Sequence, residues 1–182
     1  MVLPADVRMP FFPPVHSLPP LKASLLQWMD PPDAGPVWFE GPERLRRMLV
    51  LQSYVLVPAG PVRQVVWVDA LPRERRAAVE KLRLAAQNLM PQGRILTFMP
   101  AVSPEERGWL SKLQVRTGLC VESCAVSAWF LEAALAPVVQ AWPQGLRSWV
   151  MTAAFGLPIS HVLPVEPSQS SDILPEKKGG TS

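Results

Sequence analysis

The middle of the chain alternates between strand-like and helix-like patterns of hydrophobic positions. Val62–Asp69 is a β-branched, apolar run that predicts a strand, and so is Arg94–Met99, which follows Gly93. Between them, Pro72–Met90 predicts a helix, because its apolar residues recur at helical spacing: Ala78, Leu82, Ala85 and Leu89. Strand, helix and strand in this order are typical of an α/β protein.

A further strand is predicted before this unit, over Leu49–Val57. It could pair with Val62–Asp69 as a hairpin across the turn Pro58–Pro61, or both could be separate strands of one sheet. The pattern predicts a single-domain, three-layer α/β sandwich of Rossmann-like type. Its sheet is expected to be partly parallel and to lack a phosphate-binding loop.

Beyond residue 100 the pattern predicts one more strand and three helices. Ser103–Glu106 has the spacing of a capping box and predicts the start of a helix. Lys112–Val121 alternates apolar and polar residues and predicts a strand, in conflict with extending that helix. Phe130–Trp142 and Leu146–Phe155 are apolar stretches that predict further helices.

Proline divides the chain into three parts. Residues 1–42 hold ten of the 22 prolines, which prevents a continuous helix or strand, although Leu21–Met29 predicts one short helix. We interpret residues 1–42 as an N-terminal arm that either packs over an α/β domain of residues 43–162 or docks on a partner. The polar residues 163–182 are expected to form a disordered tail.

The composition excludes several classes of protein. The 182 residues include two cysteines and two histidines, too few for a disulfide framework or a four-ligand zinc site. We expect Cys120 and Cys124 to be buried, inert thiols. No apolar run approaches the ~20 residues that span a bilayer, and the N-terminus does not resemble a signal peptide. A soluble, cytoplasmic protein without metal or cofactor is expected.

Sites for a nucleotide find little support in the sequence. Asp69 ends an apolar strand, where a carboxylate could approach magnesium. However, no lysine lies in a Walker loop, which a nucleotide site of this kind requires. The simpler role for Asp69 is to cap the helix that is expected to begin near Pro72. A dinucleotide or adenosylmethionine site usually has a glycine-rich turn after the first strand. The turn Pro58–Pro61 has one glycine between two prolines.

One stretch does resemble a known class of enzyme. In Leu71–Pro100 a helix, a Pro-x-Gly turn and an apolar strand follow one another, as in the later part of many methyltransferases. This resemblance implies a methyltransferase-like enzyme, which we keep as an alternative function.

Positive charge is concentrated in one part of the chain. Glu43–Arg94 contains ten basic and four acidic residues, and nine of the ten are arginines. Arginine suits phosphate or carboxylate recognition, so nucleic-acid binding is a second alternative. Its candidate residues are Arg44, Arg46, Arg47, Arg73, Arg75, Arg76 and Arg83. A solvated helix face remains the other interpretation of these charges.

Residues 65–119 resemble the later part of the RecA-like core in SulA cell-division inhibitors and the related ImuA proteins of the bacterial DNA-damage response. The matching blocks are Val65–Val68 with Leu71, Leu82–Ala86, Phe98–Pro100 and Leu110–Leu119. The resemblance implies a non-catalytic RecA-like core that acts by binding another protein, as SulA-like proteins bind the division protein FtsZ.

These observations lead to the hypothesis of a non-enzymatic interaction or regulatory protein, linked to the DNA-damage response or to cell-division control. Its partner would be another protein, and nucleic acid is the alternative partner. Aromatic residues in the proline-broken arm are the candidate partner-binding residues, because such a segment cannot easily bury them alone: Phe11, Phe12, Trp28 and Trp38.

Overall fold

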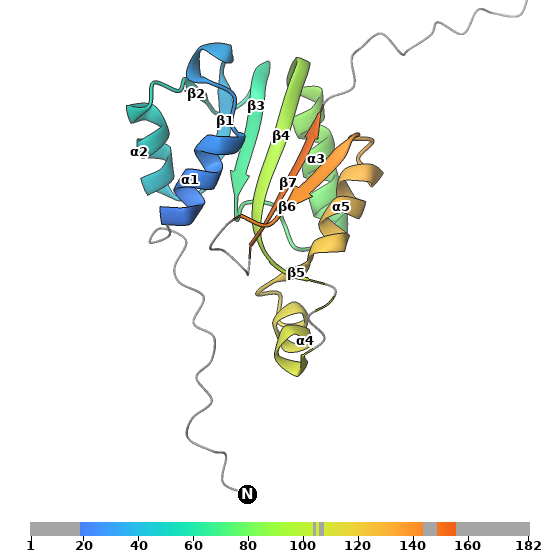
Figure 1. The fold of residues 1–182 in the computed structure, drawn as a ribbon. Coiled ribbons are helices and arrows are strands. Elements are labelled where there is room, and N and C mark those ends of the chain that lie inside the picture. The colour runs from blue at the N-terminus through green and yellow to red at the C-terminus, as the bar shows by residue number, and fades with distance from the viewer. Residues whose placement is uncertain (1–18, 104, 106–107, 144–148, 156–182) are drawn as a thin grey trace, which may run out of the picture.

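The computed structural model describes residues 19–103, 105, 108–143 and 149–155. They form a mixed seven-stranded sheet in the order β2-β1-β3-β4-β7-β6, with β5 paired to the end of β4 (Figure 1). The strands are β1 (Val37–Glu40), β2 (Leu56–Val57), β3 (Val62–Val68), β4 (Leu89–Val102), β5 (Val121–Glu122), β6 (Val138–Ala141) and β7 (Trp149–Phe155). Strands β1 to β4 are mutually parallel, whereas β7 is antiparallel to both β4 and β6.

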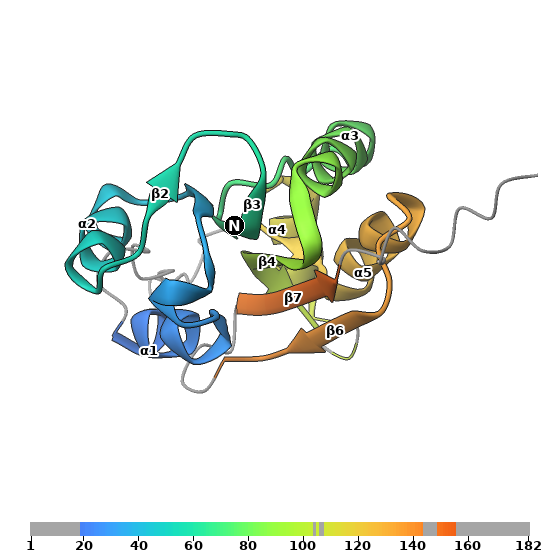
Figure 2. The same cartoon turned by 90° about the horizontal axis from the view of Figure 1, so that it is seen from above.

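Helices cover both faces of this sheet, as the view from above shows (Figure 2). One face carries α1 and α2, and the opposite face carries α3 and α5. The helices are α1 (Pro19–Trp28), η2 (Pro32–Ala34, a 3₁₀ turn), α2 (Glu43–Leu51), α3 (Arg75–Gln87), α4 (Trp109–Arg116) and α5 (Ser123–Glu132). The prediction of a single α/β domain with a partly parallel sheet is confirmed.

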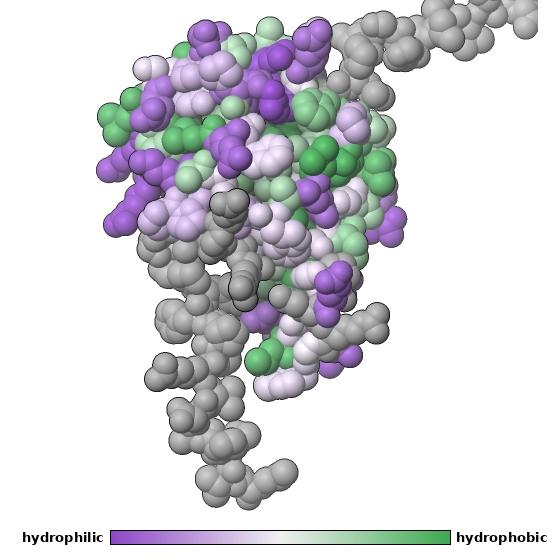
Figure 3. Space-filling model, viewed as in Figure 1, coloured by the Kyte–Doolittle hydropathy of each residue, from purple (hydrophilic) through white to green (hydrophobic). Residues whose placement is uncertain are grey.

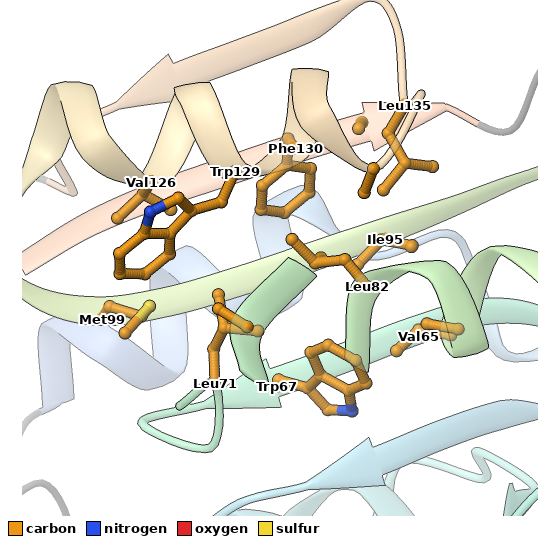
Figure 4. Close-up of a cluster of buried hydrophobic side chains, with 14 of the residues drawn as sticks. Val65, Trp67, Leu71, Leu82, Ile95, Met99, Val126, Trp129, Phe130 and Leu135 are labelled. Carbon is orange, nitrogen blue, oxygen red and sulfur yellow. The ribbon is translucent and has the colours of Figure 1, made fainter. Parts of the chain in front are cut away.

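Each face of the sheet has its own hydrophobic core. Trp67 on β3 packs with Leu82 of α3 and Phe130 of α5 in the first core (Figure 4). The second core joins Leu25 of α1 to Phe98 of β4. Successive strand residues point to opposite faces, and here both faces are covered, so Val65–Val68 of β3 and most residues of β4 from Ile95 onward are apolar.

A buried ion cluster ties the end of α1 to the sheet. Asp30 is 9% exposed, and its carboxylate forms ion pairs with Arg94 and, at 3.5 Å, with Arg63 Nε. Its backbone N–H donates a 2.8 Å hydrogen bond to Gln64 Oε1, and its carbonyl accepts one of 2.9 Å from the Tyr54 hydroxyl. The segment that follows α1 is therefore held by both charges and hydrogen bonds.

The predictions for the central part of the chain are confirmed. The helix expected at Leu21–Met29 is α1. The one expected at Pro72–Met90 is α3, which is shorter than predicted because Leu89 and Met90 already belong to β4. The strand expected at Val62–Asp69 is β3, and that at Arg94–Met99 lies within β4. The open question of pairing is also answered, because β2 and β3 both pair with β1, in parallel and on opposite sides of it.

Two predicted strands, Leu49–Val57 and Lys112–Val121, are wrong. Leu49–Val57 is not one strand, because its first residues complete α2 and only Leu56–Val57 is extended. The first half of Lys112–Val121 belongs to α4, and only Val121 lies in a strand, β5. This helix has no buried residue, so its apolar residues do not mark a face that packs against the domain. In Figure 3 the helix projects from the body of the domain. It begins at Trp109 rather than near Ser103, and two of the four residues of the expected capping box, 104 and 106, lie outside the described residues.

The end of the domain also differs from expectation. The helices predicted at Phe130–Trp142 and Leu146–Phe155 are replaced by the last turns of α5 and by the hairpin-like pair β6 and β7. Six of the seven residues of β7 are buried, because it lies between β4 and β6 with cores on both sides. A strand buried on both faces has a continuous apolar sequence, as a buried helix does.

The expected N-terminal arm contributes to the domain over the part that the structure describes. Residues 19–42 supply α1 to the second core and β1 to the sheet, between β2 and β3, although the sequence places the start of the domain at residue 43. Residues 1–18 and the expected tail, 163–182, lie outside the described residues. In the described part of the chain, no helix has both the length and the apolar character needed to cross a bilayer.

Candidate functional site

The order of the strands changes direction between β1 and β3. From β1 the chain continues to β2 on one side and then returns to β3 on the other side. In open α/β sheets, ligands bind beyond the carboxyl ends of the strands at such a switch point. The residues at this position are Glu40, the last residue of β1, Gly41, which follows it, and Asp69, which follows β3.

Lys81 of α3 connects the two strand ends. Its Nζ lies 2.6 Å from Glu40 Oε2 and donates a 2.8 Å hydrogen bond to the carbonyl of Ala70. The same ammonium lies 4.6 Å from the centre of the Trp67 ring, a cation–π contact. Glu40 is thus held in one orientation while its side chain remains 36% exposed.

Asp69 forms the second ion pair at this edge. Its Oδ1 lies 2.5 Å from Arg73 Nη2, and its side chain is 32% exposed. The expected role as a helix cap is wrong, because α3 begins at Arg75 with Glu74 in the capping position. Asp69 instead has a left-handed backbone, with φ of 55°, and its N–H donates to the carbonyl of Phe98 on β4. This conformation turns the chain out of the sheet and carries the carboxylate to its edge.

Gly41 allows the turn after β1 to lie directly against β3. A Cβ atom at this position would lie 3.0 Å from both the Phe39 ring and the Val68 Cβ, and 3.2 Å from the Val68 carbonyl oxygen. We predict that Gly41→Ala lowers the free energy of unfolding by about 1–3 kcal/mol, as overpacking does. Gly108→Ala is the control, because the nearest atom there lies 3.8 Å away. Equal urea midpoints for the two variants would contradict the prediction.

The arginines proposed for nucleic-acid binding do not form one surface. Those of residues 44–47 lie on α2, which covers one face of the sheet, whereas those of residues 75–83 lie on α3, on the opposite face. Most are paired within the chain: Arg46 and Arg47 with Glu43, Arg73 with Asp69, Arg75 with Glu132, and Arg76 with Glu80. Arg44 is exposed, and Arg83 donates to the carbonyl of Glu132.

A hollow of about 460 Å³ lies beside these α3 arginines. Three arginines and three glutamates line it together with Val79, so its formal charge is zero: Arg75, Arg76, Arg83, Glu74, Glu80 and Glu132. Balanced charge gives no net attraction for a polyanion.

The aromatic residues proposed to bind a partner are separated by the structure. Trp38 is 8% exposed and meets Trp67 edge to face, with ring centres 5.7 Å apart, so it belongs to the first core. Trp28 is half-buried against the second core. Phe11 and Phe12 lie outside the described residues.

Sequence reasoning missed Glu40, Gly41 and Lys81. A signal for the first two is present, since the apolar Val37–Phe39 is followed by an acid and a glycine, much as Val65–Val68 is followed by Asp69. The prolines around residues 37–41 instead favour the interpretation of this segment as part of an arm. Lys81 carries no local signal, because Glu40 lies 41 positions away in the sequence.

Comparison with known proteins places the fold. No family model matches the sequence, and no curated protein matches it significantly. Solved structures do match. Human N-acetylserotonin methyltransferase in complex with SAM has 12% identity and a TM-score of 0.57, covering 74% of this chain and 51% of that one. A SAM-dependent methyltransferase from Thermotoga maritima, a possible histamine N-methyltransferase, has 10% identity and a TM-score of 0.50. The match covers 78% of this chain and 91% of that one.

An O-methyltransferase family 2 protein from Planctomyces limnophilus, in complex with apigenin, is also similar. It has 16% identity and a TM-score of 0.50, covering 66% of this chain and 42% of that one. This chain likewise spans less than half of the methyltransferases SibL and PigF, at 42% and 43% of their lengths.

These neighbours correct the functional interpretation. The resemblance of residues 65–119 to SulA and ImuA proteins is wrong, because the similar structures are methyltransferases rather than RecA-like proteins. The hypothesis of a non-enzymatic regulator of DNA damage or cell division is wrong on the same finding, since the similar structures are those of enzymes. The chain has a Rossmann-like α/β fold of the kind found in SAM-dependent methyltransferases.

Proposed function

We propose that this chain is a methyltransferase-like enzyme domain that binds S-adenosylmethionine (SAM) at the carboxyl ends of β1 and β3. The observation that carries the proposal is the pair of partly exposed carboxylates, Glu40 and Asp69, at the switch point of a sheet whose fold is shared with SAM-dependent methyltransferases. The resemblance of Leu71–Pro100 to methyltransferases supports it, since this stretch contains α3 and most of β4.

The two carboxylates of the candidate site fit the chemistry of SAM better than that of a nucleotide. SAM has a sulfonium cation, an ammonium group and ribose hydroxyls, and it has no phosphate. Carboxylates accept hydrogen bonds from hydroxyl and ammonium groups and attract cations, so Glu40 and Asp69 are suitable ligands. A glycine-rich cradle is needed chiefly to bring backbone amides to phosphate groups, and the short Gly41 turn does not provide one.

The chain's own residues would orient the ligand. Lys81 fixes Glu40, and Arg73 fixes Asp69, so each carboxylate is held in place before a ligand arrives. Such preorganisation reduces the entropy lost on binding. When bound, SAM would supply the electrophilic methyl group, and the protein would supply position and electrostatics.

Calorimetric titration with SAM and with S-adenosylhomocysteine tests the proposal. We expect both ligands to bind and ATP not to bind, because the edge is lined by carboxylates and lacks a phosphate cradle. Glu40→Gln should weaken SAM binding about tenfold or more, since a hydrogen bond to a charged group contributes about 1.5–3 kcal/mol.

Glu74→Gln is the matched control, because Glu74 is exposed and its side chain makes no capping hydrogen bond. A circular dichroism spectrum of each variant verifies folding. The absence of heat at millimolar SAM, or equal affinities of the Glu40→Gln and Glu74→Gln variants, would refute the proposed function.

A further inference from the structure

A second hollow, of about 270 Å³, lies beyond the carboxyl ends of β3 and β4. It is formed by the loop after β3, the end of α4, strand β5 and the first turns of α5. The residues that line it are Arg73, Val115, Gly118, Cys120, Val121, Glu122, Ala125 and Trp129. The volume equals that of about nine water molecules in the liquid, enough for one aromatic ring with a short side chain.

The inner wall of this cavity is apolar. Val121 and Trp129 are each 6% exposed, and Trp129 also belongs to the hydrophobic cluster drawn in Figure 4. Ala125 lies one helical turn before Trp129, so its small side chain leaves space beside the indole. An indole held by a core offers a rigid surface for a ring or a cation.

The charged residues of the cavity differ in how far they are neutralised. Arg73 is engaged by Asp69 at 2.5 Å. Glu122 is exposed and forms no ion pair with any residue in the described part of the chain; its one polar side-chain contact is with the thiol of Cys124, at 3.8 Å.

Cys120 brings no charge to the cavity. It is 2% exposed, and burial raises the pKa of its thiol above the ordinary value, so that the thiol is protonated at neutral pH. Cys124 is exposed, against the expectation that both cysteines are buried. The unbalanced charge of the cavity is therefore the negative charge of Glu122.

We propose that this cavity binds a small aromatic amine as its cation, with the ring against Trp129 and Val121 and the ammonium group near the Glu122 carboxylate. The aromatic part would bury apolar surface, and the charge would select an ammonium over a carboxylate of the same size. As an acceptor site for methyl transfer, this assignment rests on the proposed function; as a ligand site, it stands on the cavity alone.

Two probes of similar size and opposite charge test the inference on the full chain at pH 7. Phenethylamine is a cation at this pH, and 3-phenylpropionate is an anion. Calorimetry should show binding of phenethylamine and at least tenfold weaker binding of phenylpropionate. In NMR spectra the amine should shift the backbone amides of residues 118–129. Equal binding of the two probes, or shifts confined to other residues, would overturn the assignment.

Two variants distinguish the apolar from the charged contribution. Ala125→Leu fills the cavity and should weaken amine binding at least tenfold, whereas Ala128→Leu, at an exposed position of the same helix, should leave it unchanged. Glu122→Gln should weaken amine binding about three- to tenfold and bring the two probes closer in affinity. Glu74→Gln is its control. An unaltered affinity in the Glu122→Gln variant would contradict the assignment even if Ala125→Leu failed to fold.

Titrating SAM into the same samples separates this inference from the proposed function. Amine binding without SAM binding would refute the proposed function and leave the cavity assignment standing. SAM binding without amine binding would refute the cavity assignment alone.

Discussion

Deletion of residues 1–36 should yield a protein that no longer unfolds cooperatively. The deletion removes α1, whose Leu21 and Leu25 are completely buried, and Met29, which is 7% exposed. Each such side chain contributes about 1.5–3 kcal/mol by its burial, and a whole domain is stable by only about 5–15 kcal/mol. The deletion also uncovers Phe98 on the sheet. Residues 19–36 are therefore part of the domain rather than a detachable arm.

Thermal unfolding followed by circular dichroism measures this effect. Deletion of residues 1–18 alone is the control, since it leaves all of the described packing in place. A variant with an intermediate effect is Leu25→Ala, for which we expect a loss of about 2–5 kcal/mol, while the exposed Lys22→Ala should change little. A shortened protein of residues 37–182 with a cooperative transition at the original temperature would contradict this account of α1.

Asp30→Asn should lower the free energy of unfolding by about 3–5 kcal/mol, the cost of removing one partner from a buried ion pair. Asparagine retains the backbone groups that bond Gln64 and Tyr54, so the change acts on the charge. It leaves Arg94 and Arg63 facing each other without the carboxylate between them. Burial lowers the pKa of Arg94, because the protein around its guanidinium solvates the charge less well than water does.

Urea denaturation gives the measurement, with Asp33→Asn as control for the loss of one negative charge at an exposed position three residues later. The midpoint should fall for Asp30→Asn with an unchanged slope, as expected for a change of stability alone. In the Asp30→Asn background, Arg94→Met should cost much less than it does in the native chain, because the ion pair is already broken. Additive effects of the two substitutions would show that the pair is not coupled.

The sequence was sufficient to predict the unit of β3, α3 and β4, and the reason is physical. Helix α3 buries one stripe, with Ala78, Leu82 and Ala85 inside, and leaves charged residues in solvent, so its pattern reports its burial directly. Strand β3 is bounded by residues that favour turns, and its β-branched composition suits a strand covered on both faces.

The elements near the end of the domain could not be predicted by the same rule. The pattern of β7 reflects burial on both faces, which gives a run of apolar residues without a period. Helix α4 has no buried residue, so burial does not determine the order of its apolar and polar residues. That order happens to alternate as in a strand, at Leu113, Val115 and Thr117. Hydrophobic periodicity identifies an element only where one of its faces is buried and the other is not.

The candidate site was only partly visible in the sequence. Asp69 stood out because it follows an obvious strand, but the role predicted for it was wrong, since its partner Arg73 and its left-handed backbone belong to the turn. Glu40 and Lys81 come together only when β1 takes its place beside β3 and α3 packs across the sheet. Contacts between residues distant in the sequence depend on topology, which a local pattern does not contain.

The position of β7 has a consequence for synthesis of the protein on the ribosome. In the described part of the chain, β7 pairs with β4 along Arg94–Pro100, on the side of β4 that faces away from β3, and Leu96 is opposite Ala153. Until β7 emerges, this edge of β4 presents unpaired backbone N–H and C=O groups beside apolar side chains, and it can pair with the same edge of a neighbouring chain. Crowded polysomes would favour such exchange, so chaperone binding during translation should govern the yield of soluble protein.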